Sequence, residues 1–218
     1  MQRQIWISGE CKLEGTLHLP GAAAARGGVV VCHPHPQYGG DMHFYLVRRV
    51  AQACADRGWA ALRFNFRGVG NSSGRFDHGR GEVNDVAAAA AFLARQIGEQ
   101  RPLGLAGYSF GSLMAARYVA DGGQVDALAL IALVAAAADA DDFTGLKRYT
   151  GPLLSVSGGR DRIAPPDATA AFLHQLGLTA QSICYAESDH FFGAVSDGLS
   201  DRVADFFDRS FACDDSSA

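Results

Sequence analysis

Residues 105–113 read LAGYSFGSL, an apolar run that ends in a glycine and is followed by a serine between two aromatic residues. Gly-x-Ser-x-Gly is common in ordinary turns, because both residue types suit turn conformations. The same spacing is also typical of a sharp bend between a strand and a helix that presents one serine hydroxyl. The five residues leave both interpretations open, so the rest of the chain has to decide between them.

The composition is that of a globular protein, with 218 residues of which 48% are hydrophobic and 19% charged. Nothing in the composition divides the chain, so we expect one domain over residues 1–218, with disorder at residues 1–3 and 212–218. A net charge of −4 disfavours a nucleic-acid partner. The longest apolar run, around residues 127–138, is too short to span a bilayer. Residues 1–12 lack the apolar core of a signal peptide, so we expect a cytoplasmic protein without a membrane partner.

Apolar segments alternate with helix-like segments along the chain. Two β-like runs within residues 4–19 predict an antiparallel hairpin at one edge of a sheet. The later pattern predicts an α/β fold with a mostly parallel central sheet and helices on both faces. Its predicted strands are residues 27–32, 59–66, 102–108, 125–134, 152–158 and 180–188. Its predicted helices are residues 41–57, 81–96, 111–121, 166–177 and 199–211.

Three polar residues each follow one of these predicted strands: Ser109, Asp161 and His190. Ligands of parallel sheets bind beyond the carboxyl ends of the strands, so the three should lie at one edge. A serine hydroxyl is a weak nucleophile without a nearby base, which a histidine supplies, and an acid can hold that histidine in place. Three other acids stay open as alternatives to Asp161, since they follow the preceding strand: Asp139, Asp141 and Asp142.

With GYSFG, GGRDRIAP, DHFF and HPHPQYGG in these loops, residues 4–211 resemble the α/β-hydrolase family. The resemblance is closest to its small lidless serine hydrolases, which are related to dienelactone hydrolases and prolyl-oligopeptidase catalytic domains. It implies Ser109 as nucleophile, His190 as base and Asp161 as orienting acid. It also implies cleavage of an ester or thioester of a short acyl group without a cofactor. Residues 135–151, which join two predicted strands, are too few for a cap domain.

Such a hydrolase needs two backbone N–H donors for the developing oxyanion. Phe110, directly after the serine, is the first predicted donor. His35 is the second, because it stands between two prolines that have no N–H, with Gln37 and Tyr38 as alternatives. The residues expected to bind substrate are Tyr38, Phe191 and Phe192.

Two other stretches suggest different chemistry. His33 and His35 form an HxH pair, but HPHPQY does not match the HxHxDH motif of two-metal hydrolases, so we predict no metal and a structural role for His33. FRGVGNSSG, residues 66–74, superficially resembles a phosphate cradle. Ser73 occupies the third glycine position of the dinucleotide motif, so we expect a structural turn with Arg67 in an internal salt bridge.

Three functions therefore remain, in order of preference. The first is a serine hydrolase acting on a small-molecule acyl substrate, as a monomer or weak homodimer. The second is a non-catalytic binding module of the same fold, which would typically lack one of the three polar residues. The third is a metal-dependent hydrolase. The five cysteines are scattered without a CxxC pair, which disfavours a disulfide framework and a structural zinc site.

Overall fold

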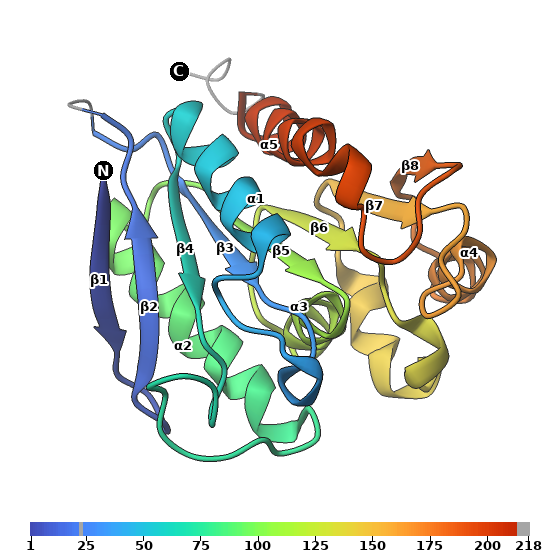
Figure 1. Ribbon diagram of the computed structural model, residues 1–218, viewed down its shortest axis with the longest axis horizontal. Helices are drawn as coiled ribbons and strands as arrows, with labels where there is room; N and C mark the ends of the chain where they lie inside the picture. The colour runs from blue at the N-terminus through green and yellow to red at the C-terminus, as the bar shows by residue number, and fades with distance from the viewer. Residues whose placement is uncertain (22–23, 213–218) are drawn as a thin grey trace.

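The computed structural model describes residues 1–21 and 24–212, and these form a domain around one eight-stranded sheet (Figure 1). The strand order is β1-β2-β4-β3-β5-β6-β7-β8. The strands are β1 (Gln2–Ile7), β2 (Leu13–His18), β3 (Gly28–Cys32), β4 (Ala60–Phe64), β5 (Leu103–Tyr108), β6 (Ala127–Ile131), β7 (Leu153–Gly158) and β8 (Gln181–Tyr185). From β4 to β8 all neighbours are parallel, as the alternation of strands and helices predicts.

The predicted N-terminal hairpin is present, with β1 antiparallel to β2 and β2 antiparallel to β4. The expectation of disorder at residues 1–3 is wrong, because Gln2 and Arg3 belong to β1. The backbone of Met1 also exchanges hydrogen bonds with that of Leu19. These pairings satisfy the backbone groups of the first residues. At the other end, Ala212 closes the last helix, and residues 213–218 lie outside the described residues.

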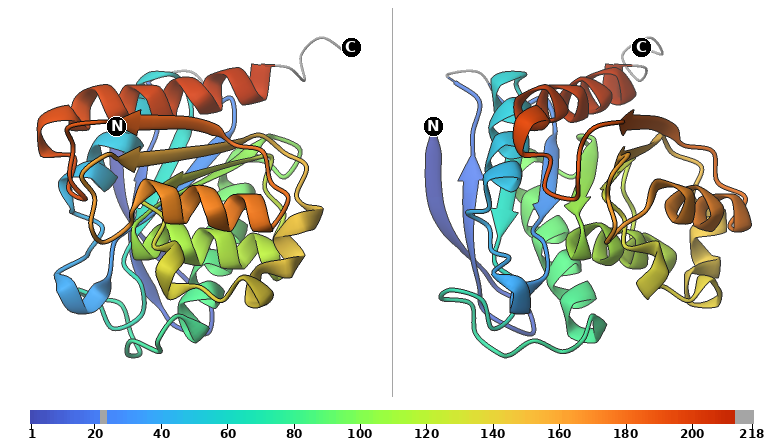
Figure 2. Two further views of the ribbon diagram at one scale, coloured as in Figure 1. Left: turned by 90° about the vertical axis from the view of Figure 1, so that its right-hand side faces the viewer. Right: turned by 45° about the vertical axis from the view of Figure 1, so that its right-hand side comes forward.

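Five α-helices of the described chain cover the two faces of the sheet (Figure 2). One face carries α1 (Tyr45–Asp56) and α5 (Ser196–Ala212), and the other carries α2 (Arg80–Ile97), α3 (Phe110–Ala120) and α4 (Pro166–Gln175). Each face has its own hydrophobic cluster, and successive residues of β3 point alternately to the two faces. Val29 and Val31 pack under α1, and Val30 faces α2. Burial on both faces explains why the central strands read as continuous apolar runs.

The carboxyl edge of the sheet has no cap domain. Between β6 and β7 the chain forms only the two 3₁₀ helices η2 (Ala135–Ala137) and η3 (Ala140–Arg148). They pack beside α4 and α3 respectively. No helix in the described part of the chain combines the length and the hydropathy that crossing a membrane needs.

Candidate active site

The bend at residues 107–111 joins β5 to α3 through Ser109 alone. β5 ends at Tyr108 and α3 begins at Phe110. Ser109 therefore takes φ 56° and ψ −118°, in a region that residues other than glycine rarely adopt. Such a conformation costs about 1–3 kcal/mol and persists only where the surrounding structure holds it.

The two glycines of this bend are required by close packing. A Cβ atom on Gly107 would lie 2.2 Å from the carbonyl oxygen of Gly111. A Cβ atom on Gly111 would lie 2.4 Å from the carbonyl oxygen of Cys32, at the end of β3. The bend is thus pressed against the end of β3, which brings Ser109 close to the loop formed by residues 33–40.

Ser109, His190 and Asp161 form one hydrogen-bonded chain. The Oγ atom of Ser109 lies 2.9 Å from Nε2 of His190, and Nδ1 of His190 lies 2.7 Å from Oδ2 of Asp161. All three are largely buried, at 7%, 6% and 4% exposure. A neutral imidazole that carries its proton on Nδ1 donates to the carboxylate and leaves Nε2 to accept the serine proton. The arrangement can therefore move a proton away from Oγ.

Asp161 is held by the chain around it. Its second oxygen, Oδ1, accepts hydrogen bonds from the backbone N–H groups of Ile163 at 2.8 Å and Ala164 at 2.7 Å. These two bonds fix the carboxylate plane and leave Oδ2 for His190. The loop after β7 therefore orients this acid before any ligand arrives.

The alternative acids make other contacts. Asp139 accepts from the backbone N–H of Asp141 at the start of η3, and Asp142 pairs with Arg117. Asp161 is the acid whose carboxylate bonds His190 among the described residues.

The carbonyl oxygens of the loop that carries His190 are bonded by two tyrosines that the sequence analysis did not single out. The hydroxyl of Tyr108 donates to the carbonyl oxygen of His190 at 2.9 Å, and that of Tyr45 donates to the carbonyl oxygen of Phe191. Burial raises the pKa of Tyr108, which keeps the hydroxyl protonated as a donor. In the sequence, Tyr108 could have been found because it stands next to Ser109. Tyr45 gives no such signal, because it is far from the three site residues along the chain.

The two predicted oxyanion donors keep free N–H groups. Within residues 1–21 and 24–212, no acceptor is found for the backbone N–H of His35 or Phe110. The alternatives are engaged, because Gln37 donates to Nδ1 of His35 and Tyr38 donates to the carbonyl oxygen of His35. The ring of His35 packs against the ring of Phe110 with centroids 5.0 Å apart, which holds the two segments together.

His33 uses both ring nitrogens inside the protein, in agreement with its predicted structural role. Nδ1 donates to the carbonyl oxygen of Pro34 at 2.6 Å, and Nε2 accepts from the backbone N–H of Phe66 at 3.1 Å. Burial lowers the pKa of this histidine to about 4, so the ring is neutral near pH 7. Neither nitrogen is left for a metal ion.

The three predicted substrate-binding residues differ in exposure. Tyr38 is 86% exposed and Phe191 is 52% exposed, so both can contact a ligand. Phe192 is fully buried, with its ring against those of Tyr108 and Tyr185. Its expected contact with substrate is wrong, because the chain turns at Phe192 with φ 54° and its ring lies in the hydrophobic core.

The polar groups of the 66–74 loop make contacts within the protein rather than forming a phosphate cradle. Arg67 makes the predicted internal salt bridge, with 2.8 Å between its Nη2 and Oδ1 of Asp85, and a second with Glu10. The hydroxyl of Ser72 accepts from the backbone N–H of Glu14 and donates to a backbone carbonyl oxygen. The polar groups that suggested a ligand site thus serve the fold.

Comparisons with known proteins agree with the observed fold. A family model described as alpha/beta hydrolase fold matches residues 29–147. An uncharacterised protein of Rickettsia prowazekii, RP471, is 30% identical over 182 residues, which are 81% of this chain and 76% of that protein.

Two solved structures are similar over nearly the whole chain. XC6422 from Xanthomonas campestris, described as an α/β serine hydrolase without lid, is 30% identical with a TM-score of 0.85, covering 96% of this chain and 95% of that one. An α/β serine hydrolase homologue from Coxiella burnetii is 30% identical with a TM-score of 0.83, covering 93% and 96%.

Proposed function

Since the chain belongs to the α/β-hydrolase family, we propose that it is a serine hydrolase that cleaves an ester or thioester bond of a short acyl substrate. The observation that carries the proposal is the hydrogen-bonded chain from Ser109 through His190 to Asp161. Family membership alone does not give an activity, because one fold hosts many functions. The chemistry is therefore argued from these side chains.

The proposed reaction has two halves. His190 takes the proton of Ser109 as Oγ bonds to the carbonyl carbon of the substrate, and Asp161 stabilises the imidazolium that results. The backbone N–H groups of Phe110 and His35 donate to the oxyanion. His190 then gives its proton to the leaving alcohol or thiol, which leaves an acyl group on Ser109. Water attacks this acyl-enzyme by the same route, so the reaction needs no cofactor.

The lack of a cap at the carboxyl edge of the sheet supports the proposal of a short acyl substrate. No cap lies between β6 and β7 to enclose a long acyl chain, and the exposed aromatic side chains beside the site are those of Tyr38 and Phe191. Short acyl groups, or acyl groups presented by a larger partner, therefore suit the site better than free long-chain lipids. With less exclusion of water, catalysis depends mainly on the oxyanion donors and the proton relay.

Labelling with a fluorophosphonate tests the proposal. We expect stoichiometric labelling of the wild-type protein, no labelling of Ser109→Ala, and full labelling of Ser182→Ala, which removes an exposed hydroxyl on β8. The labelled protein should lose its activity toward p-nitrophenyl esters or acyl-thioesters, and a chelator should have no effect on the untreated enzyme. A folded wild-type protein that neither takes the label nor turns over these substrates would be a binding module instead.

A further inference from the structure

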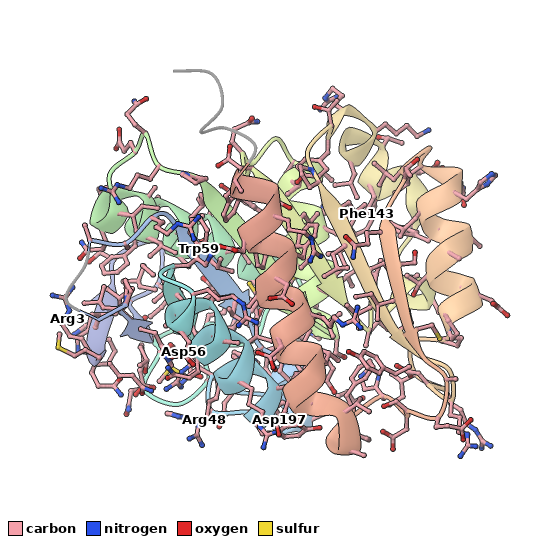
Figure 3. All side chains as sticks on the ribbon, turned by 90° about the horizontal axis from the view of Figure 1, so that it is seen from above. Arg3, Arg48, Asp56, Trp59, Phe143 and Asp197 are labelled. Atoms are coloured by element: carbon pink, nitrogen blue, oxygen red, sulfur yellow. The ribbon has the colours of Figure 1, made fainter. Side chains whose placement is uncertain are left out.

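A pocket lies outside the candidate active site, between α1, the edge strand β1 and its neighbour β2. Its volume is about 320 Å³, and it is lined by Gln2, His18, Tyr45, Arg48, Arg49 and Gln52. Figure 3 shows Arg48 at the outer edge of the molecule, on the side of α1. Two arginines and a histidine line the pocket and no acid does, in a chain whose net charge is −4.

His18 offers this pocket a hydrogen-bond donor that has no acceptor. The residue is 2% exposed, and its Nε2 accepts from Nε of Arg63 at 2.9 Å. The ring proton therefore lies on Nδ1, which is buried without a hydrogen-bond partner among the described residues. Burial, followed by the charge of Arg63, lowers the pKa of His18 to about 4, so the ring stays neutral and keeps this donor near pH 7. The side chain of Gln52 interacts with the ring and partly offsets this lowering of the pKa, although Nδ1 has no hydrogen bond of normal geometry among the described residues.

Arg63 places a positive charge behind His18. It is 4% exposed, and its other contacts are the carbonyl oxygen of Met42 at 2.9 Å and Nδ1 of His43 at 3.4 Å. Across the described residues, no carboxylate forms an ion pair with it. Buried charges are normally paired, because taking an ion out of water is costly. An anion in the adjacent pocket would supply the missing negative charge.

The charges at the mouth of the pocket leave a positive excess. Arg49 already pairs with Asp197 on α5, and Gln52 bonds Asp56. Arg48 forms no ion pair within residues 1–21 and 24–212, so its guanidinium remains available. Guanidinium groups match the oxygens of phosphate in geometry and charge.

We propose that this pocket binds the phosphate group of a small ligand, which pairs with Arg48 and, when the exposed side chain of Gln52 moves aside, accepts the Nδ1 proton of His18. A doubly charged phosphate balances these groups better than a single carboxylate does. The pocket exceeds the size of a phosphate ion, so a phosphomonoester also fits. The binding does not depend on the proposed hydrolase activity. Tyr45 lines the pocket and also donates a hydrogen bond to the carbonyl oxygen of Phe191. This side chain therefore connects the pocket to the loop that carries His190.

Titrations at constant ionic strength test this site, with inorganic phosphate, glycerol phosphate and glycerol as probes. We expect both phosphates to bind, glycerol not to bind, and the imidazole resonances of His18 to shift with phosphate. Arg48→Gln should weaken phosphate binding about tenfold or more, as expected for the loss of a charge-assisted hydrogen bond. Arg95→Gln, which removes an exposed arginine on α2, is the matched control and should bind as the wild type does.

Two results would overturn the proposal: phosphate that stabilises the protein no more than chloride at equal ionic strength, or equal phosphate affinity in wild type and Arg48→Gln. Arg48 is exposed and makes no core contact, so this variant should fold normally. Inorganic phosphate and glycerol phosphate of equal affinity would identify free phosphate as the sufficient ligand. Tighter binding of glycerol phosphate would identify a phosphomonoester.

Discussion

The 107–111 bend and the 66–74 loop are both rich in glycine and serine, yet they use these residues in opposite ways. Gly70 and Ser109 have the same backbone angle, φ 56°. In the 66–74 loop a glycine takes this left-handed conformation, as is usual. In the bend the serine takes it, and the neighbouring glycines are needed for space. A serine at the strained position indicates that its side chain is required there.

The hydroxyl partners of the two regions differ in the same sense. The hydroxyl of Ser72 accepts from the backbone N–H of Glu14 on β2 and donates to the carbonyl oxygen of Asn65, directly after β4. This hydroxyl therefore stabilises local structure. Ser109 has its hydroxyl beside the ring of His190, a group that can change its protonation. The two regions therefore have similar composition, and they differ in the group that each serine hydroxyl contacts.

The largest expected effect is that of Ser109→Ala on catalysis. We expect kcat for ester hydrolysis to fall by about 10⁶-fold, as when a nucleophilic serine is removed from a triad. The free energy of unfolding should change by only about 1 kcal/mol, because alanine keeps the same backbone strain and loses only the hydrogen bond to His190. Steady-state kinetics and urea unfolding measure the two quantities. Ser72→Ala is the matched control, with activity kept and about 1–3 kcal/mol of stability lost. Substantial turnover by purified Ser109→Ala would refute the mechanism.

Asp161→Asn should have the next largest effect, lowering kcat by about 10⁴-fold, because an amide favours the wrong tautomer of His190. Asp139→Asn and Asp142→Asn should each leave turnover nearly unchanged, since neither carboxylate contacts the imidazole. Kinetics of the three variants with one ester make the comparison. The opposite ranking would assign the orienting acid to the loop after β6.

Arg67→Met tests the structural half of the comparison. It leaves the carboxylate of Asp85 buried without its partner, so we expect the free energy of unfolding to fall by about 3–5 kcal/mol. Turnover of the folded fraction should change little, because Arg67 contacts none of the three proposed catalytic side chains. Adding Asp85→Leu should recover much of the loss, since the unpaired charge is then gone. An Arg67→Met protein of wild-type stability would show that the pair is not structural.

The meeting of Ser109, Asp161 and His190 could be predicted because it depends on topology alone. Each residue follows a parallel strand, and parallel strands end at one edge of the sheet. The motifs place the three loops without any knowledge of side-chain directions. The lack of a cap follows in the same way from the few residues between β6 and β7.

Features that depend on side-chain direction could not be predicted. Phe191 and Phe192 are the same residue type at adjacent positions, yet one is 52% exposed and the other fully buried. The proposed phosphate pocket joins His18 from β2 to Arg48 from α1, and no local pattern connects them. The expected start of α1 at Asp41 is likewise wrong, because Asp41 instead bonds the backbone N–H of His43 in a turn before the helix.

The smallest expected effect concerns His33, which lies between the two regions. It accepts the backbone N–H of Phe66, where the 66–74 loop begins, and its carbonyl oxygen lies against Gly111. Burial lowers its pKa in the folded protein from 6.5 to about 4. The unfolded chain therefore binds a proton at a higher pH than the folded protein does. The contribution of His33 to stability is complete above pH 6.5 and is lost as the pH falls towards 4.

The shift corresponds to about 3 kcal/mol in total, of which about 2 kcal/mol should be lost between about pH 7 and about pH 5. Urea unfolding at the two pH values should show this loss in the wild type, and His33→Gln should show a pH dependence weaker by that amount. His174→Gln, which removes an exposed histidine on α4, should keep the wild-type dependence. His18 also has a pKa lowered to about 4, so some acid sensitivity should remain in His33→Gln. If His33→Gln and the wild type lose stability equally on acidification, the pKa of His33 is not lowered in the folded protein.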